Sequence, residues 1–156
     1  MVQLRDDEVR RLISYLRKQT DDLEALAAIE DELRDDEAED FLRAPEILTY
    51  FPALTEAVTC LDKTWQLLVL PHAHLRMVQR GVKKQAVVDI FSRFIEYCAA
   101  EGELITIGTY AIYDQAASIT LRIDVDSIAE AGGNSHVVTV FSGHSYRPNQ
   151  TEVILM

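Results

Sequence analysis

The sequence predicts an α+β protein in which helices pack on one face of a mainly antiparallel β-sheet, with an acidic helical N-terminal extension. Apolar residues recur at helical spacing in the first part of the chain, a strand and two helices follow, and the last third alternates apolar and polar residues. With 156 residues, 48% of them hydrophobic, the chain can bury one sizeable core. We therefore expect a helical extension over residues 1–60 and an α+β domain over residues 61–156.

The N-terminal segment is expected to be helical over residues 6–38, with a break at residues 20–22. Thr-Asp-Asp at this break is typical of a helix N-cap. A third helix is expected over residues 45–60, kinked at Pro52. The apolar positions that support the first two helices are Val9, Leu12, Ile13 and Leu16, and then Leu23, Leu26, Ile29 and Leu33.

The middle of the chain predicts a strand followed by two helices. Residues 65–70 form an apolar run that ends at Pro71, a residue suited to the first turn of a helix. Gly81 separates this short helix from a second one over residues 83–99. The second helix carries an apolar stripe that we expect in the core, made of Val87, Val88, Phe91, Phe94, Ile95 and Cys98.

The C-terminal part predicts several closely linked strands. Apolar and polar residues alternate most regularly over residues 119–125, and Ala-Gly-Gly-Asn at residues 131–134 is typical of a turn. We expect the flanking strands to pair as antiparallel neighbours. The expected strands are residues 104–107, 110–113, 119–125 and 135–142, with an edge strand at residues 151–155.

Charge is distributed unevenly in this chain, whose net charge is −11. Residues 1–60 carry 16 acidic and seven basic side chains, a net charge of −9, whereas residues 61–156 carry ten acidic and eight basic ones. Within the nearly neutral second part, residues 72–93 hold five basic side chains against one carboxylate. An acidic segment is thus joined to a domain with a local basic patch.

The cysteines, the first residues and the apolar runs indicate the compartment and the relation to membranes. The two cysteines, Cys60 and Cys98, have no motif spacing, and we expect reduced thiols in a cytoplasmic protein. The charged first residues do not resemble a signal peptide. The longest apolar run is far shorter than the ~20 residues that span a bilayer, so no membrane association is expected.

The segment 72–82 carries the most informative side chains. His72, Arg76 and Arg80 are spaced by four residues, so they stack on one side of a helix, while apolar residues fall on the other side. A titratable imidazole beside fixed positive charge suits the binding of a phosphate or another anion. The alternative is an ordinary amphipathic helix with a solvated basic face.

The ordered pattern His-Ala-x-x-Arg-Met-x-x-Arg-Gly-Val-x-x-x-x-Val over residues 72–87 carries a family resemblance. Together with the later strand His-Val-Val-Thr-Val-Phe at residues 136–141, it resembles small domains of the barnase, EndoU, colicin and RelE type. Several of these are metal-independent ribonucleases used as toxins. The resemblance covers roughly residues 64–142 and leaves the acidic segment unmatched.

The resemblance implies an RNA-cleaving site without a metal or other cofactor. His72 would be the acid/base, with Arg76 and Arg80 holding the phosphate. Thr139 and Arg122 would complete the site from neighbouring strands. The resulting candidates are His72, Arg76 and Thr139 as catalytic residues, and Arg80, Lys83 and Arg122 as substrate-binding residues.

Two functions of different classes remain open from the sequence. One is a ribonuclease-like toxin or effector domain that binds RNA through the basic patch at residues 72–93 and is kept inactive by its acidic segment. The other is a noncatalytic interaction protein, such as an antitoxin, an immunity protein or a phage factor, that binds a basic protein through residues 1–60. The net charge favours the second function, because negative charge repels RNA. The ordered His/Arg motif favours the first, and the ribonuclease-like domain is the function that we expect.

Overall fold

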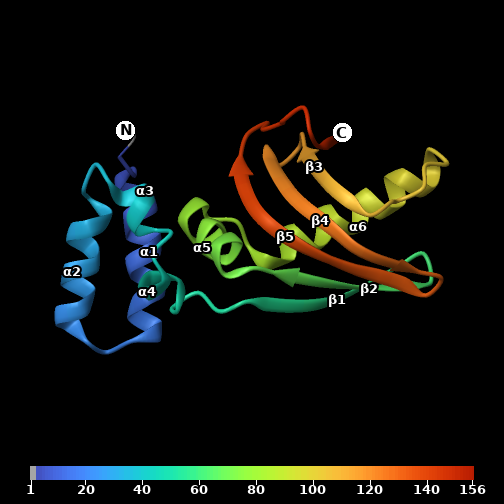
Figure 1. Ribbon diagram of the computed structural model, residues 1–156. Helices are drawn as coiled ribbons and strands as arrows, with labels where there is room; N and C mark the ends of the chain where they lie inside the picture. Colours follow the sequence, from blue (N-terminus) through green and yellow to red (C-terminus); the bar gives the residue numbers. More distant parts are fainter. Residues whose placement is uncertain (1–2) are drawn as a thin grey trace.

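The computed structural model describes residues 3–156, which form six helices and one six-stranded sheet (Figure 1). The helices are α1 (Asp6–Gln19), α2 (Leu23–Leu33), α3 (Ala38–Phe41), α4 (Pro45–Leu48), α5 (Pro71–Arg80) and α6 (Lys84–Ala100). The strands are β1 (Leu54–Cys60), β2 (Lys63–Val69), β3 (Gly108–Asp114), β4 (Ile119–Ala129), β5 (Gly132–Ser142) and β6 (Thr151–Leu155). They lie in the order β1-β2-β5-β4-β3-β6.

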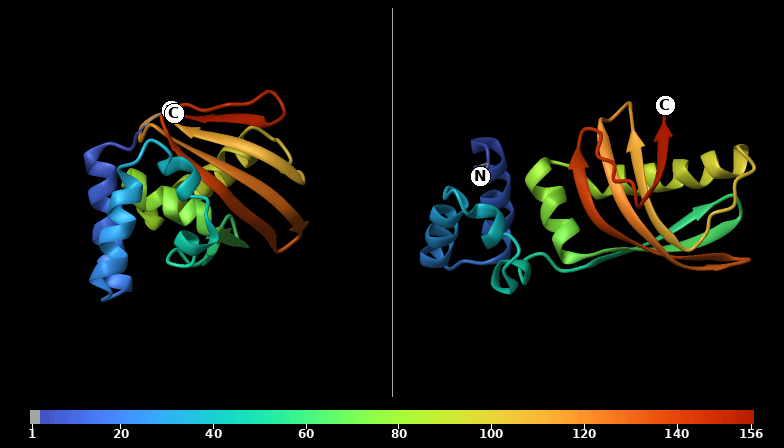
Figure 2. Two further views of the ribbon diagram at one scale, coloured as in Figure 1. Left: turned by 60° about the vertical axis from the view of Figure 1, so that its left-hand side comes forward. Right: turned by 45° about the horizontal axis from the view of Figure 1, so that its top comes forward.

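This architecture confirms the predicted α+β class. The pairs β1–β2, β4–β5 and β3–β4 are antiparallel, whereas β2–β5 and β3–β6 are parallel. β4 and β5 are antiparallel neighbours, as expected, and β6 forms an edge. Helix α6 packs its apolar stripe on one face of the sheet (Figure 2). We call the opposite face of β3, β4 and β5 the open face; Thr109, Arg122, Asp124 and Thr139 lie on it.

The expected helix over residues 45–60 is wrong for most of its length. Helix α4 ends at Leu48, and residues 54–60 form the edge strand β1, paired with β2 from Leu54↔Val69 to Cys60↔Lys63. Pro52 stops the helix, and the β-branched residues that follow favour an extended strand. The sheet therefore begins at Leu54, inside the segment expected to be the helical extension.

The expected strand over residues 104–107 is also absent from the described structure, which has irregular chain there. Leu104 and Ile107 are exposed, and the sheet resumes at Gly108. The apolar run at residues 104–107 is only four residues long, and its sequence pattern does not distinguish a strand from a loop. Whether such a short run pairs with another strand depends on the rest of the fold.

The glycines expected in a turn, Gly132 and Gly133, already belong to β5. A Cβ on Gly132 would lie 1.8 Å from the carbonyl oxygen of Thr64, and Gly132 has φ +141°. A Cβ on Gly133 would lie 2.3 Å from the carbonyl oxygen of Ser127 and 2.7 Å from the Trp65 ring. Glycine is therefore required here by the close approach of the β2 backbone to Gly132 and of the β4 backbone to Gly133, not only by the turn.

The N-terminal helices pack on the rest of the chain through α5. A second apolar cluster joins α1, α2 and the segment up to Phe51 to Leu75 of α5. Polar contacts support this packing, because the Arg11 guanidinium donates to the Gln79 carbonyl at 2.9 Å and the Gln79 amide donates to Glu8 at 3.0 Å. Helix α2 begins at the predicted break, where the Asp22 carboxylate accepts from the Ala25 amide. Figure 1 shows these helices beside α5, at one end of the sheet.

Candidate functional site

Helix α5 places the predicted His/Arg motif between the N-terminal helices and the end of β5. Pro71 occupies its first turn and Gly81 ends it in the left-handed conformation, at φ +69°. β2 ends at Val69, opposite Val137, so the last residues of β5 keep β4 on one side but have no strand on the other, where α5 lies. Arg80 compensates for this loss, because its guanidinium donates to the carbonyl of Val140.

Arg76 is fully engaged by the protein itself. It is only 4% exposed and forms a two-pronged ion pair with the Glu39 carboxylate of α3. It also donates to the Gln79 side-chain oxygen at 2.6 Å and, through Nε, to His72 Nε2 at 3.3 Å. The proximity of Arg76 lowers the pKa of the Glu39 carboxyl. A carboxylate from the acidic segment thus occupies the position that a phosphate was expected to take.

His72 is poorly suited to the acid/base role expected of it. Burial, with the nearby charges of Arg76 and Arg43, lowers its pKa from 6.5 to about 4. The ring is therefore neutral near pH 7, and its Nε2 lone pair already accepts the bond from Arg76. Near pH 7 few His72 rings carry the second proton that a general acid donates. The Nε2 lone pair that a general base needs already accepts the hydrogen bond from Arg76.

We expect His72 to make the fold sensitive to acid. Between pH 6.5 and about 4 the unfolded chain takes up a proton at this site that the folded chain does not, so stability falls as the pH is lowered through this window. Urea unfolding at pH 7 and pH 4.5 should show that His72→Asn loses less stability than the unmodified chain, by on the order of 2 kcal/mol. Gln115→Asn, at a neutral exposed residue between β3 and β4, is the control and should lose as much as the unmodified chain. Equal losses in all three proteins would contradict the prediction.

A second group of polar side chains lies on the open face, where two β-bulges align them. Register shifts occur between Arg122 and Ile123 and between Val125 and Ser127, so Val138 and Asp126 are the extra residues. Strict alternation would put His136 and Thr139 on opposite faces, because they are three residues apart. The bulge at Val138 brings both to the open face, with Thr139 opposite Arg122 and His136 opposite Asp124.

Arg122 is a buried cation on the open face. It is 8% exposed, and its Nε and Nη2 atoms are buried with no hydrogen-bond partner among residues 3–156. Its guanidinium lies 4.7 Å from the centre of the Phe141 ring, and Arg80 lies 5.3 Å from the same ring. Burial and the charge of Arg147 lower the Arg122 pKa. Unsatisfied buried donors are rare and costly, so these two nitrogens are donors available to an acceptor such as an anion.

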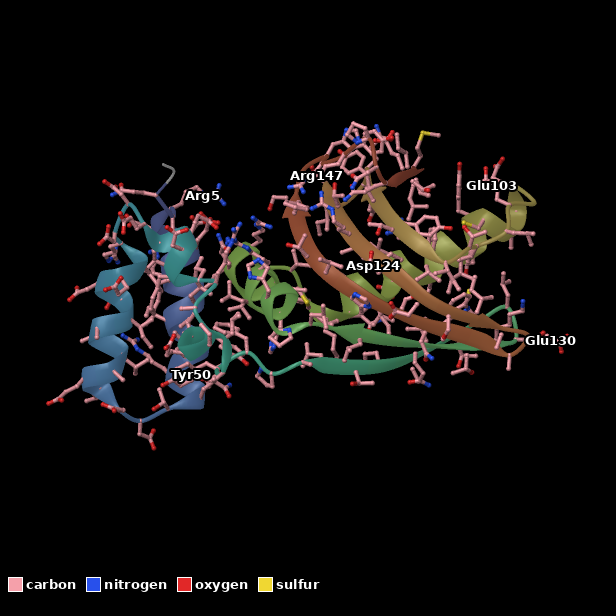
Figure 3. All side chains as sticks on the ribbon, in the orientation of Figure 1. Arg5, Tyr50, Glu103, Asp124, Glu130 and Arg147 are labelled. Carbon is pink, nitrogen blue, oxygen red and sulfur yellow. The ribbon has the colours of Figure 1, made fainter. Side chains whose placement is uncertain are left out.

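His136 has the neighbours expected of an acid/base residue. Its Nδ1 lies 2.7 Å from an Asp126 oxygen and its Nε2 lies 3.3 Å from an Asp124 oxygen. Thr109 donates to Asp124 at 2.6 Å and so fixes the second carboxylate. Each ring nitrogen of His136 thus lies near a carboxylate oxygen of β4. Figure 3 labels Asp124 on β4 and shows Arg147 near the end of β5.

The residues predicted from the sequence therefore separate into two groups rather than converging in one cleft. His72 and Arg76 face α3 and its Glu39, while Arg122 and Thr139 lie on the open face. Arg80 connects the groups by reaching Val140 and the Phe141 ring. Lys83 belongs to neither group, since it precedes α6 and lines a groove beside α1. The other cations of that groove are Arg10, Arg11 and Lys18.

Sequence reasoning missed His136 and Phe141 as site residues. His136 lies in the strand that carries the family resemblance, and Asp124 and Asp126 were visible on the preceding strand. Their proximity depends on the strand register. The alternating pattern indicates which face of the sheet a residue lies on, but not which residues of the neighbouring strand it lies opposite. The bulges shift that pattern by one residue, and no sequence signal marks where they occur.

Three further observations concern metal binding, membrane spans and similarity to known proteins. Residues 3–156 contain no cluster of three or more His, Cys, Asp or Glu side chains that could hold a metal ion. None of the helices in that range combines the length and apolar character needed to cross a bilayer. Comparison with family models, curated proteins and solved structures finds no match. The information on function therefore comes from the geometry of the site.

Proposed function

We propose that this protein binds RNA on the open face of its sheet and cleaves it without a metal, as a ribonuclease-like toxin or effector domain. The observation that carries the proposal is the Arg122 guanidinium, which is buried, lies over the Phe141 ring and has no carboxylate partner among residues 3–156. The chain has 26 acidic and 15 basic residues, yet none of its described carboxylates pairs with this cation. A phosphodiester supplies the missing charge and acceptors.

The residues around Arg122 have distinct proposed roles in binding the RNA. Arg122 and Arg80 bind the phosphate, and Phe141 offers a ring on which a base can stack. The Thr139 hydroxyl, opposite Arg122, can donate to a phosphate oxygen. Arg122 and Asp124 are two residues apart on β4, about 7 Å along the strand, so one nucleotide can contact both.

The proton transfers follow from the His136 contacts. Asp124 accepts the proton of the 2′-hydroxyl, the 2′-oxygen bonds to phosphorus, and the bond from phosphorus to the 5′-oxygen breaks. His136 gives its proton to the departing 5′-oxygen, and Asp126 keeps the ring oriented. The longer contact, from His136 Nε2 to Asp124, is the one that opens for substrate. The products are a 2′,3′-cyclic phosphate and a 5′-hydroxyl, and no co-reactant is needed.

Access to Arg122 requires a local movement. Its buried nitrogens are reached when the half-buried Phe141 ring turns away from the guanidinium, which the exposed end of β5 permits. The strongly acidic chain repels RNA at long range, so we expect weak binding that tightens at low salt.

The first test is cleavage of mixed RNA by the full chain in excess EDTA, with end-group analysis for 2′,3′-cyclic phosphate. Arg122→Gln should lower the cleavage rate about 100-fold, because it removes the charge on the transition state. Arg17→Gln, at an exposed cation on α1, removes the same charge away from the site and should change the rate less than twofold. Absence of cleavage, or equal effects of both variants, would contradict the enzyme proposal.

The acidic segment is proposed to restrain RNA binding through Glu39. The Glu39 carboxylate pairs with Arg76 and also acts electrostatically on Arg80, one of the proposed phosphate ligands, so Glu39→Gln should raise RNA affinity severalfold at low salt. Glu37→Gln makes the same charge change on an exposed residue of the same segment and should have little effect. Affinity is measured by fluorescence anisotropy below the melting temperature of each variant, since Arg76 loses its buried partner. Equal affinities for the two variants would exclude a specific restraint by Glu39.

The second candidate function is a noncatalytic protein that binds a basic partner through residues 1–60. It is favoured by the net charge of −9 in that segment and by the exposed carboxylates around the α2–α3 turn. This function predicts salt-sensitive binding of a basic protein, no RNA cleavage, and no effect of Arg122→Gln on that binding.

A further inference from the structure

A groove runs between α1 and the C-terminal end of α5, two helices that lie side by side (Figure 1). We call it the cationic groove, after the basic residues Arg10, Arg11, Lys18 and Lys83 that line it. Its volume is about 460 Å³. Along α1 it extends from Arg10 to Lys18, about 12 Å along the helix axis. Arg11 is neutralised within the protein, because it pairs with Asp7 at 3.0 Å.

The other three cations of the groove remain without a carboxylate. Arg10, Lys18 and Lys83 are exposed, and none of them forms an ion pair with another residue in the range 3–156. The chain has 26 acidic residues, yet none of the described ones lines this groove. The cationic groove is therefore a local positive region on a strongly acidic protein.

The floor of the groove is apolar. Met77 and Val82 are buried there, and Tyr15 and Val78 are half-buried. The Tyr15 ring is stacked on Phe51, with the ring centroids 4.8 Å apart, so it forms part of the wall and is not a free ring for a nucleic-acid base. An apolar floor with a charged rim is typical of a surface that binds a protein segment, because apolar side chains cover the floor while charged groups pair at the rim.

We propose that the cationic groove binds an acidic segment of a partner protein, in which apolar side chains lie between carboxylates. Arg10 and Lys18 lie on α1 and Lys83 lies just before α6, so carboxylates on both sides of a bound segment find a cation. The run along α1 admits about four residues of extended chain. None of the groove residues belongs to the open face, so this interaction does not rest on the proposed binding of RNA.

The first test is binding of a fluorescein-labelled hexapeptide, Glu-Glu-Leu-Phe-Glu-Glu, to the full chain at low salt. Fluorescence anisotropy should show saturable binding. Two matched peptides separate the two parts of the site. Gln-Gln-Leu-Phe-Gln-Gln removes the charge and Glu-Glu-Gly-Ser-Glu-Glu removes the apolar side chains, and each should bind about tenfold more weakly. No saturable binding of the first peptide up to about 1 mM, or equal affinity for the three peptides, would overturn the proposal.

Charge reversals on the protein locate the binding. Arg10→Glu and Arg17→Glu make the same change at exposed residues of α1, but only Arg10 lines the groove. Arg10→Glu should weaken binding of the acidic peptide about tenfold, and Arg17→Glu less than about threefold. Lys83→Glu tests the opposite wall and should act as Arg10→Glu does. Circular dichroism establishes that each variant is folded, and equal effects of the two arginine variants would contradict the proposal.

A single-stranded RNA oligonucleotide tests the other class of acidic partner. Its affinity should change by the same factor in Arg10→Glu and in Arg17→Glu, because neither residue lies on the open face. A selective loss of RNA affinity in Arg10→Glu, with peptide affinity unchanged, would assign the groove to nucleic acid and overturn the proposal. Neither RNA cleavage nor Arg122 enters the peptide measurements, so failure of this proposal is distinguishable from failure of the proposed ribonuclease function.

Discussion

Replacing His136 with alanine is expected to lower RNA cleavage at least about 100-fold, because the variant loses the proton donor for the departing 5′-oxygen. The imidazole is held between Asp124 and Asp126 at 3.3 and 2.7 Å, so its orientation is fixed before substrate arrives. The measurement is the initial rate of cleavage in excess EDTA, with RNA affinity determined in parallel. The rate should fall much more than the affinity, because His136 acts on the leaving group rather than on binding.

The matched control for this experiment is His144→Ala. His144 also pairs with a carboxylate, that of Glu152, at 2.7 Å, but it lies in the loop after β5 and its partner is on β6 rather than on β4. Its removal should change the cleavage rate less than threefold. His136→Gln, which keeps hydrogen bonding but cannot transfer a proton at neutral pH, should be as impaired as the alanine variant. Comparable losses at both histidines, or full activity of His136→Gln, would contradict the assigned role.

Gly132→Ala is expected to destabilise the protein by at least about 3 kcal/mol, and it is the largest stability effect that we expect. The added Cβ would lie 1.8 Å from the Thr64 carbonyl oxygen, in a backbone conformation with φ +141°. The atom it meets belongs to the backbone of β2, so relief requires β2 and β5 to separate. Urea unfolding monitored by circular dichroism measures the loss.

Gly102→Ala serves as the control for backbone conformation alone. Gly102 also has positive φ, +68°, but a Cβ there meets nothing within 4 Å. It should cost only about 1 kcal/mol, the usual penalty for a left-handed alanine. Similar losses for both variants would show that the close approach of β2 and β5 is not what requires glycine at residue 132.

Much of the local structure was determined by the sequence. The helices beginning near Asp6 and Leu23, the strand before Pro71 and the alternating strand after Ile119 all follow from apolar spacing, caps and breakers. These signals are local, because each depends on residues within a few turns or one strand. The uneven charge of the chain is likewise a property of composition. The helical face with His72, Arg76 and Arg80 also formed as its spacing indicated.

Only the tertiary structure decided which of these residues meet. The Glu39 carboxylate reaches Arg76 from 37 positions away, and the Thr64 backbone demands glycine at residue 132. The sequence predicts a helix up to residue 60, whereas pairing with β2 makes residues 54–60 the edge strand β1. The two bulges place His136 beside Asp126, and Thr139 beside Arg122, on one face. Such contacts depend on register and packing between segments distant in sequence, and no periodicity within one segment encodes them.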